Sequence, residues 1–500
     1  MANRRFNLVD ESWAPIAEYD RAGLGAIFSN PKFPALGGTV LQKIALFKLL
    51  LAIAQAACTP ETDEEWKKLG VEGMAEACRA YLEKWHDSFW LYGDKPFLQY
   101  PAVSRAKELD YGTIIPEVAT GNATWLFHSQ VPPASHDVDD AQRALALLVQ
   151  MACCFGGKKP DSSVALTPGW VKKSSKPGPA ICSLGLLHSF FVGGSLLQSI
   201  WFNLLTKEDI RQEKTYTEGI GTPPWEDMPS GENDARAQQL QRSLMGRLVP
   251  LARFILFEDV ALRLVEGIQH PDYLTHGMVD PSVTANFSGK KPKMLWADPN
   301  RRPWRSLTAI LGFLDHDKNG FVCRQIKWCA KRIRLSECSG FGIWVGGIRL
   351  SSNAGEQYLS GNDDVVESEL NLPTGVFDGE ESQWFDFLQK SMTTLESIAK
   401  ILYRAVFFYY QDVQSDKKAE FANYATQLFW QRAEYEFSAL NNACDDASEE
   451  GNAQRERIFS RIIGHAMSCY SQACPEDTAR QLAVYVQHTP RFGKVLQKRV

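Results

Sequence analysis

Cysteine pairs with metal-binding spacing are missing from this sequence. The 500 residues include eleven cysteines, and no two of them have the C-x-x-C spacing that structural zinc sites usually use. The odd count, the loose spacing and the lack of a secretory leader predict reduced thiols in a cytoplasmic protein. We therefore expect no bound metal and no cofactor.

Catalytic and nucleotide-binding motifs are also missing. The chain contains no G-x-x-x-x-G-K-[ST], G-x-G-x-x-G, H-E-x-x-H or G-x-S-x-G. Three His-Asp dipeptides, at His86, His136 and His316, keep open the alternative of a metal-dependent nuclease or phosphohydrolase. His316 is the best metal candidate because it lies between Asp315 and Asp317, but its segment is typical of a turn. We favour surface polar residues and a protein that is not an enzyme.

Long apolar runs and an excess of one charge are absent as well. The most apolar early run, residues 41–57, is 17 residues long and contains Lys43 and Lys48, so it is too short and too charged to span a bilayer. A formal net charge of −5, with 23% charged residues, excludes a uniformly basic nucleic-acid coat but leaves room for local basic faces. We expect no membrane partner.

The hydrophobic pattern predicts an α+β fold in two domains. Five hundred residues at 44% hydrophobic suffice for one large core or two. We expect a mixed α/β domain over residues 1–370 and a four-helix bundle over residues 371–500. Its first helix carries an apolar stripe at Leu388, Met392, Leu395, Ala399, Leu402, Val406 and Tyr409. The other predicted helices cover 41–57, 64–90, 140–152, 417–440, 452–473 and 476–486, and strands are expected within 5–16, 254–265 and 341–350.

Two blocks of charge are plain in the second half. Residues 286–334 hold twelve Lys or Arg against three Asp, a net of +9, interleaved with Trp296, Trp304 and Trp328. This composition favours a nucleic-acid contact, the alternative being a scaffold that binds acidic protein surfaces. Residues 356–381 hold eight acids and no base, with proline and glycine breakers, and we interpret them as a linker.

A glycine-lysine motif, CCFGGKK at residues 153–159, follows directly on an expected helix, where glycine is favoured because it accepts positive φ. Gly156 and Gly157 lack Cβ atoms, so their backbone can enter a space as narrow as the DNA minor groove, about 6 Å wide. Lys158 and Lys159 are placed to contact flanking phosphates. The alternative is that the glycines only end the helix and the lysines are solvated.

Several short motifs occur along the chain in the order found in one protein family. On these motifs the chain resembles the large subunit of the type I-E CRISPR Cascade effector, often called CasA, from near its N-terminus to its end. They are FNLVDESWAPI (6–16), DKPFLQ (94–99), ATGNATWLFHSQ (119–130), ALALLVQMACCFGGKK (144–159) and WVGGIRLSSNA (344–354), the last resembling a family glycine turn.

The resemblance implies a role in reading DNA. In a complex with guide RNA and other Cascade subunits, such a subunit recognises a short flanking motif on double-stranded DNA, helps to open it and recruits a helicase-nuclease in trans. Gly156, Gly157 and Lys158 match the minor-groove segment, and Asn353 matches a polar wedge, with Ser352 or Gln357 as alternatives. Asn122, Trp125 and Phe127 match the segment anchored near the 5′ end of the guide RNA, the alternative for Phe127 being a buried core aromatic.

At two places this chain departs from the family pattern, so the family's residue roles do not carry over there. The family's lysine finger falls near residues 266–277, where this chain has no lysine, and Lys290, Lys291 and Lys293 are the nearest substitutes as phosphate contacts. Some relatives also carry paired C-x-x-C cysteines in the middle region. Their absence, together with the missing finger, leaves the flanking motif that is read open, because minor-groove readout depends on few side chains.

Overall fold

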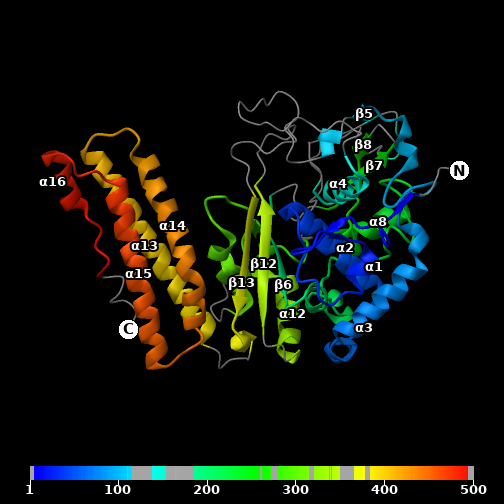
Figure 1. The fold of residues 1–500 in the computed structure, drawn as a ribbon, viewed down its shortest axis with the longest axis horizontal. Helices are drawn as coiled ribbons and strands as arrows, with labels where there is room; N and C mark the ends of the chain where they lie inside the picture. Colours follow the sequence, from blue (N-terminus) through cyan, green and yellow to red (C-terminus); the bar gives the residue numbers. More distant parts are fainter. Residues whose placement is uncertain are drawn as a thin grey trace. The chain divides into compact units, whose positions relative to one another are not determined.

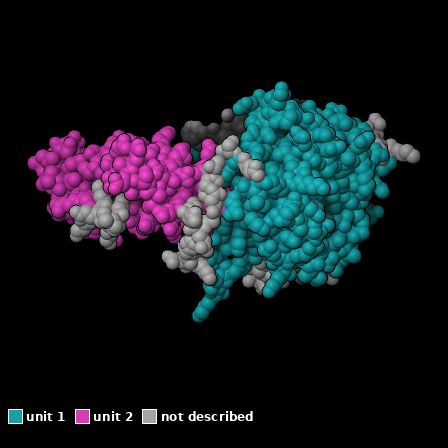
Figure 2. Space-filling model, turned by 90° about the horizontal axis from the view of Figure 1, so that it is seen from below, with its two compact units in different colours: residues 1–313, 318–369 teal, residues 314–317, 370–500 magenta. Residues whose placement is uncertain are grey.

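The structure, a computed structural model, describes most of the chain. The described residues are 5–109, 111–114, 138–153, 161, 164, 166, 185–258, 262–271, 279–314, 320–336, 338, 340–349, 365–377 and 383–493. The chain divides into two compact units, residues 1–313 with 318–369 and residues 314–317 with 370–500 (Figure 2). The boundary expected from the sequence lies between residues 370 and 371.

Small sheets make up the β part of the first unit. Among the described residues they are β1-β4, β2-β3, and three sheets with strand orders β10-β9-β11, β13-β12-β6 and β5-β8-β7. Figure 1 labels the strands of the last two sheets. The strands are β1 (Arg5–Asn7), β2 (Ala14–Pro15), β3 (Arg21–Ala22), β4 (Trp90–Tyr92), β5 (Glu108–Leu109), β6 (His188–Val192), β7 (Arg253–Phe257), β8 (Leu262–Glu266), β9 (Thr284–Asn286), β10 (Lys293–Met294), β11 (Phe321–Cys323), β12 (Phe341–Ile348) and β13 (Val365–Leu372).

Helices complete the first unit and form most of the second. Those of the first unit are α1 (Leu24–Ile27), α2 (Val40–Cys58), α3 (Asp63–Lys84), α4 (Asp140–Cys153), α6 (Leu196–Phe202), α7 (Lys207–Gln212), α8 (Ala235–Gln241), α9 (Met245–Leu248), α11 (Leu307–Ile310) and α12 (Arg324–Leu335). Those of the second unit are α13 (Trp384–Asp412), α14 (Lys418–Ala443), α15 (Glu449–Ala473) and α16 (Ala479–His488). The predicted α+β fold is therefore confirmed.

Helix α2 is the central core helix of the first unit. It begins with a capping box in which Gln42 N donates to Thr39 Oγ1 and Thr39 N donates to Gln42 Oε1. By length and composition α2 is apolar enough to cross a membrane, but 78% of its most apolar window is buried inside the protein. Lys48 lies wholly in the core, where it pairs with Asp280 and donates to the Arg247 carbonyl at 3.1 Å. A helix that is apolar on all sides is expected in such a position.

Three sequence predictions for the first unit are corrected. The run 254–265 is not one strand but two, β7 and β8, paired antiparallel. The helix expected over 64–90 ends at Lys84, and β4 follows it. The linker expected over 356–381 contains β13, whose alternate residues Val366 and Ser368 are buried against the sheet. There the alternation of side chains outweighs the acidic composition.

The second unit is a helical bundle, as predicted. All seven residues of the stripe expected on its first helix are buried in α13. Helix α13 packs against α14, α15 and the short α16, and α14 also packs against α15. Tyr409 and Tyr410 of α13 donate to the carbonyls of Pro475 and Ala473 at the end of α15, the former at 2.5 Å. These contacts fix the last turns of the long helices together.

Candidate nucleic-acid interface

Helix α4 leads into the CCFGGKK motif and is anchored at its N-terminus. Asp140 accepts a hydrogen bond from Tyr92 Oη at 2.6 Å and pairs with Arg5 at 3.1 Å. An acid in the first turn also suits the helix dipole. Arg143, one turn later, donates to the same Tyr92 oxygen at 2.9 Å. Burial and the bond to Asp140 raise the pKa of Tyr92, so it stays a neutral donor.

The C-terminal turn of α4 is also anchored. Met151 O accepts from Ala252 N at 3.0 Å, just before β7, and Gln150 Nε2 donates to Ile114 O at 3.1 Å. The described part of this helix runs to Cys153, the first residue of the motif. Gly156, Gly157, Lys158 and Lys159 lie outside the described residues. The structure thus shows that the helix preceding the predicted minor-groove segment is held in place at both of its described ends.

Strand β12 leads toward the predicted wedge. The strand expected within 341–350 is confirmed as β12. Gly346 and Gly347, which the resemblance placed in a turn, are therefore strand residues, and Gly346 pairs with His188 of β6. A Cβ on Gly346 would lie 2.4 Å from the Trp344 ring, and one on Gly347 would lie 2.6 Å from the Leu186 carbonyl oxygen. The two glycines are therefore explained by close packing rather than by a turn.

The remaining residues predicted from the family lie outside the described part of the chain. They are Asn353, with its alternatives Ser352 and Gln357, and the guide-RNA residues Asn122, Trp125 and Phe127. Of the stretch where the family has a lysine finger, residues 266–271 are described. Glu266, Ile268 and His270 are buried there, so this part of the stretch does not project as a finger.

Helix α2 supports the two elements, α4 and β12, that lead into the predicted minor-groove segment and the predicted wedge. It packs against α4 and against β12, and Val40 at its start lies against Gly346. Lys43 pairs with Glu367 of β13 at 2.5 Å, and the same carboxylate oxygen accepts from Trp344 Nε1 at 2.7 Å. The elements that precede residues 154–160 and 351–364 therefore rest on one buried helix.

The β9–β10 hairpin presents the lysines proposed as phosphate contacts. Lys290 and Lys291 lie in its turn and Lys293 in β10, and all three are exposed and form no ion pair with any described residue. Ser288 N and Oγ donate to Asn286 Oδ1 at 2.9 and 2.6 Å, which fixes the start of the turn. The hairpin therefore holds three uncompensated cations on a defined backbone.

One further residue at this hairpin, Phe287, was missed by the sequence reasoning, and a cation of the basic block lies over it. The Phe287 ring is 39% exposed, and the Arg324 guanidinium lies over it at 5.8 Å from the ring centroid. Arg324 is held by an ion pair with Glu213 at 2.8 Å. Trp296, flagged by the sequence, is 48% exposed beyond β10. An exposed aromatic beside cations offers a stacking surface for a nucleobase. The basic residues that follow Phe287 in the sequence are the pattern that could have pointed to it.

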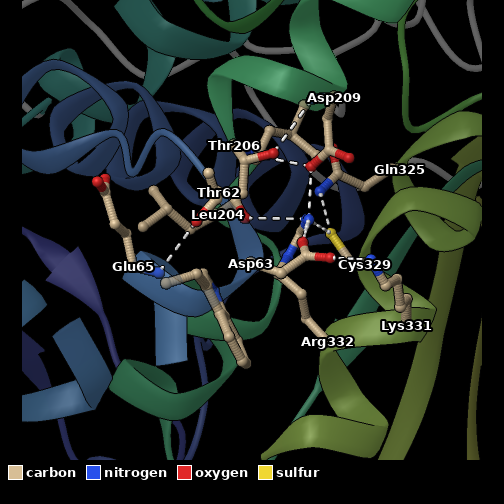
Figure 3. Close-up of polar contacts among 12 residues, drawn as sticks. Thr62, Asp63, Glu65, Leu204, Thr206, Asp209, Gln325, Cys329, Lys331 and Arg332 are labelled. Carbon is tan, nitrogen blue, oxygen red and sulfur yellow. Dashed lines mark hydrogen bonds and ion pairs between the residues drawn. The ribbon is translucent and has the colours of Figure 1, made fainter. Parts of the chain in front are cut away.

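Part of the remaining basic block is structural. Trp304 and Arg305 are buried. Arg332 is fully buried and donates to Asp63 at 3.0 Å and to Asp209 at 2.6 Å (Figure 3). Lys331 pairs with the other oxygen of Asp63 at 2.5 Å. This network joins α12 to the first turns of α3 and α7, so these cations hold the fold together.

The described His-Asp dipeptide gives no metal site. His86 contacts Asp10 at 2.7 Å and its carbonyl accepts from Asn7 Nδ2, whereas Asp87 accepts from Trp90 Nε1. The two side chains thus have separate partners. Within the described ranges no group of three or more His, Cys, Asp or Glu is placed to hold a metal ion. The other two dipeptides, which begin at His136 and His316, lie outside those ranges.

Comparison with solved structures shows the same fold over nearly the whole chain. CasA of Thermus thermophilus superposes with a TM-score of 0.74 at 20% identity, covering 99% of this chain and 100% of that one. Cse1 of Thermobifida fusca gives 0.75 at 16% identity, covering 99% and 98%. A chain from a structure described as a CRISPR RNA-guided surveillance complex gives 0.68 at 15% identity, covering 98% and 99%.

Sequence comparison agrees with the fold. The CRISPR-associated protein CasA/Cse1 of Thermus thermophilus is 27% identical over 334 residues. This match spans 61% of this chain and 60% of that relative, less than two thirds of its length. The sequence profile of the family described as CRISPR-associated protein Cse1 matches residues 7–465. The chain therefore belongs to the CRISPR-associated protein Cse1 family.

Proposed function

We propose that this chain is a non-catalytic subunit of an RNA-guided antiviral complex in the cytoplasm. It reads the flanking motif of double-stranded DNA through the minor groove, assists strand opening and recruits a helicase-nuclease that cleaves in trans. The observation that carries this proposal is the family match over residues 7–465, joined to a fold shared with a chain of a CRISPR RNA-guided surveillance complex. Its partners are guide RNA, the other Cascade subunits and the target DNA.

The proposal divides the candidate residues by the chemistry they offer. Gly156, Gly157 and Lys158 enter the minor groove, and Asn353 acts as the wedge beside the first base pair. Lys159, Lys290, Lys291 and Lys293 contact phosphates, which position the duplex without reading sequence. Asn122, Trp125 and Phe127 anchor the subunit at the guide RNA. The described hairpin supports the phosphate role, because its lysines are exposed and uncompensated.

The first test compares guide-loaded complexes assembled with and without this chain. Binding is measured by gel shift on matched duplexes whose three flanking base pairs are randomised. We expect the chain to confer selection of about 10- to 100-fold for one flanking motif, since each wrong base pair costs about 1–3 kcal/mol. Equal binding and equal selection with and without the chain would refute the proposal, and a nuclease assay of the isolated chain with added divalent metal would then test the phosphohydrolase alternative.

The hairpin gives a second prediction. Replacing Lys290, Lys291 and Lys293 together with alanine removes up to three phosphate contacts. We expect affinity to fall about equally for all flanking sequences, and the slope of log K against log salt to decrease by about 2 to 3. Filter binding between about 50 and 200 mM salt measures both quantities. A loss confined to one flanking motif would contradict a phosphate role and assign base readout to these lysines.

A further inference from the structure

Helices α2 and α3 bring two cysteines together. Cys58 is the last residue of α2, and Cys78 lies in the second half of α3. The two helices pack against each other, and the thiol of Cys78 is a hydrogen-bond partner of the Cys58 sulfur. Met74 and Leu82, one turn to either side of Cys78, are buried on the same face of α3. The two sulfurs therefore meet at a packed helix interface.

The two thiols differ in exposure and in acidity. Cys58 is partly exposed, and its sulfur lies 3.4 Å from the Ala54 carbonyl oxygen, whereas Cys78 is fully buried. The hydrogen bond from Cys78 lowers the pKa of Cys58 although burial opposes this, and burial together with the same bond raises the pKa of Cys78. The thiolate is the reactive form of cysteine, so Cys58 is the better nucleophile and the one that solvent reaches.

Both helices are anchored close to this pair. Gln55 of α2 donates to the Leu205 carbonyl at 3.0 Å, and the indole of Trp66 in α3 stacks on Trp201 with 3.9 Å between ring centroids. Gly70, at φ +63°, breaks α3 between Trp66 and the second half of the helix, and a Cβ there would meet nothing within 4 Å. A disulfide needs a sulfur separation of about 2.05 Å. The glycine break permits the small shift from hydrogen-bond contact to that distance.

Other described cysteines have different surroundings. Cys323 and Cys329 lie within electrostatic reach of each other, but both are fully buried, and burial raises their pKa values to about 12 and about 11. Cys338 is partly exposed, but its sulfur accepts a hydrogen bond from the Gln198 amide at 3.1 Å. Cys58 combines partial exposure with a neighbouring thiol, which is the arrangement of a redox-sensitive pair.

We propose that Cys58 is a site of oxidation by peroxides and that Cys78 resolves the product as a reversible disulfide between α2 and α3. The Cys58 sulfur first attacks hydrogen peroxide. The S–O bond forms, the O–O bond breaks, and the departing hydroxide takes the Cys58 proton, which gives a sulfenic acid and water. The Cys78 sulfur then attacks the Cys58 sulfur. The S–S bond forms, the S–O bond breaks, and the departing hydroxide takes the Cys78 proton as a second water.

The proposed bond protects Cys58 and is reversible. Two thiols are oxidised and one peroxide is reduced to two waters, so no further reactant is needed. Capture by Cys78 keeps Cys58 from the irreversible sulfinic acid, and exchange with a small thiol restores both cysteines. Transient disulfides of this kind are the ones expected in a reducing compartment. The bond also adds a covalent link to α2, the helix against which α4 and β12 pack.

The test is peptide mapping of the full-length chain. The reduced protein is treated with hydrogen peroxide, its remaining thiols are alkylated, and it is digested with trypsin without reduction. Cleavage after Lys48, Lys67, Lys68 and Arg79 places the two cysteines in separate peptides, 49–67 and 69–79. We expect these peptides to be linked, and dithiothreitol to release them. We also expect the oxidised chain to unfold about 3–5 °C higher than the reduced one.

Three variants assign the roles of the two sulfurs. In Cys78→Ser we expect no linked peptide, and Cys58 gains oxygen as sulfenic and sulfinic acid instead. In Cys58→Ser we expect peroxide to consume Cys78 at least about tenfold more slowly than it consumes Cys58 in the unmodified chain, because the better thiolate is missing. The matched control, Cys338→Ser, removes another partly exposed cysteine and should leave the linked peptide and the thermal shift unchanged.

The remaining outcomes count against the proposal. If Cys58 stays fully alkylatable after peroxide treatment of the unmodified chain, it is not a site of oxidation, and this measurement needs no variant to fold. A link from Cys58 to another cysteine, or a covalent dimer on a non-reducing gel, removes Cys78 as the resolving thiol. Equal loss of Cys78 with and without Cys58 reverses the assigned order of attack. These readouts do not involve DNA, so they stand or fall separately from the proposed function.

Discussion

Replacing Arg332 with methionine lowers the free energy of unfolding by about 3–5 kcal/mol, the usual cost of removing one partner from a buried ion pair. The guanidinium donates to Asp63 and Asp209, and also to the Leu204 carbonyl at 3.2 Å (Figure 3). Methionine fills most of the volume but leaves two carboxylates facing each other in the core. Chemical denaturation followed by tryptophan fluorescence measures the loss.

A rescue variant separates charge from packing. Adding Asp63→Asn and Asp209→Asn removes the unpaired charges, while the amide oxygen introduced at position 209 can still accept from Thr206 N at the start of α7, as the carboxylate does. We expect most of the lost stability to return. A triple variant as unstable as the single one would show that packing, not charge, was lost.

The same network predicts a dependence of stability on pH. Lys331 and Arg332 hold the pKa of Asp63 below its usual value although burial opposes this. The contribution of Asp63 is therefore present above the usual carboxyl pKa and is lost as pH falls through the lowered one. Denaturation curves of the unmodified chain and of Asp63→Asn, measured over the acid range, should converge as the pH falls.

The second large effect concerns DNA recognition. Gly156→Asp combined with Gly157→Asp adds two side chains and two negative charges to the segment proposed to enter the minor groove. Both changes oppose close approach to phosphates, so we expect motif-dependent binding to weaken by about 100-fold or more, since two lost contacts of about 1–3 kcal/mol each are at stake. Gel shift with matched and mismatched flanking motifs measures the change.

The control for this variant carries the same charge elsewhere. Gly340 and Gly464 are exposed, and a Cβ on either meets nothing within 4 Å. Gly340→Asp with Gly464→Asp should therefore bind like the unmodified chain. Unchanged thermal unfolding of the test variant excludes a folding defect. Normal motif-dependent binding by Gly156→Asp with Gly157→Asp would remove these glycines from the interface.

Local periodicity explains which parts of the fold were predictable. The stripe on α13 and the apolar run of α2 are set by residues close in sequence, and both helices appear as expected. Strands β7 and β8 were merged because residues 258–261 read EDVA and contain no glycine, proline or asparagine to mark a turn. The strand over 341–350 follows from its own local pattern, whereas the turn at Gly346 and Gly347 rests on the family resemblance alone, and glycine serves turns and close packing equally.

The roles of cations depend on distant partners. Arg332 lies 269 residues from Asp63 and 123 from Asp209, so a basic run in the sequence gives no hint that one member is buried. Lys290, Lys291 and Lys293 come from the same run and are exposed.

The placement of α2 beneath both α4 and β12 bears on how such a protein is engineered. The segments proposed to read and to wedge the DNA start from elements with a common foundation, whose lateral spacing is set by buried side chains of one helix. If residues 154–160 alone were taken from a relative, they would follow an α4 whose distance from β12 suits the segments of this chain and not those of the relative. Exchange of motif preference between family members therefore calls for a cassette that carries both segments together with the α2 residues under them.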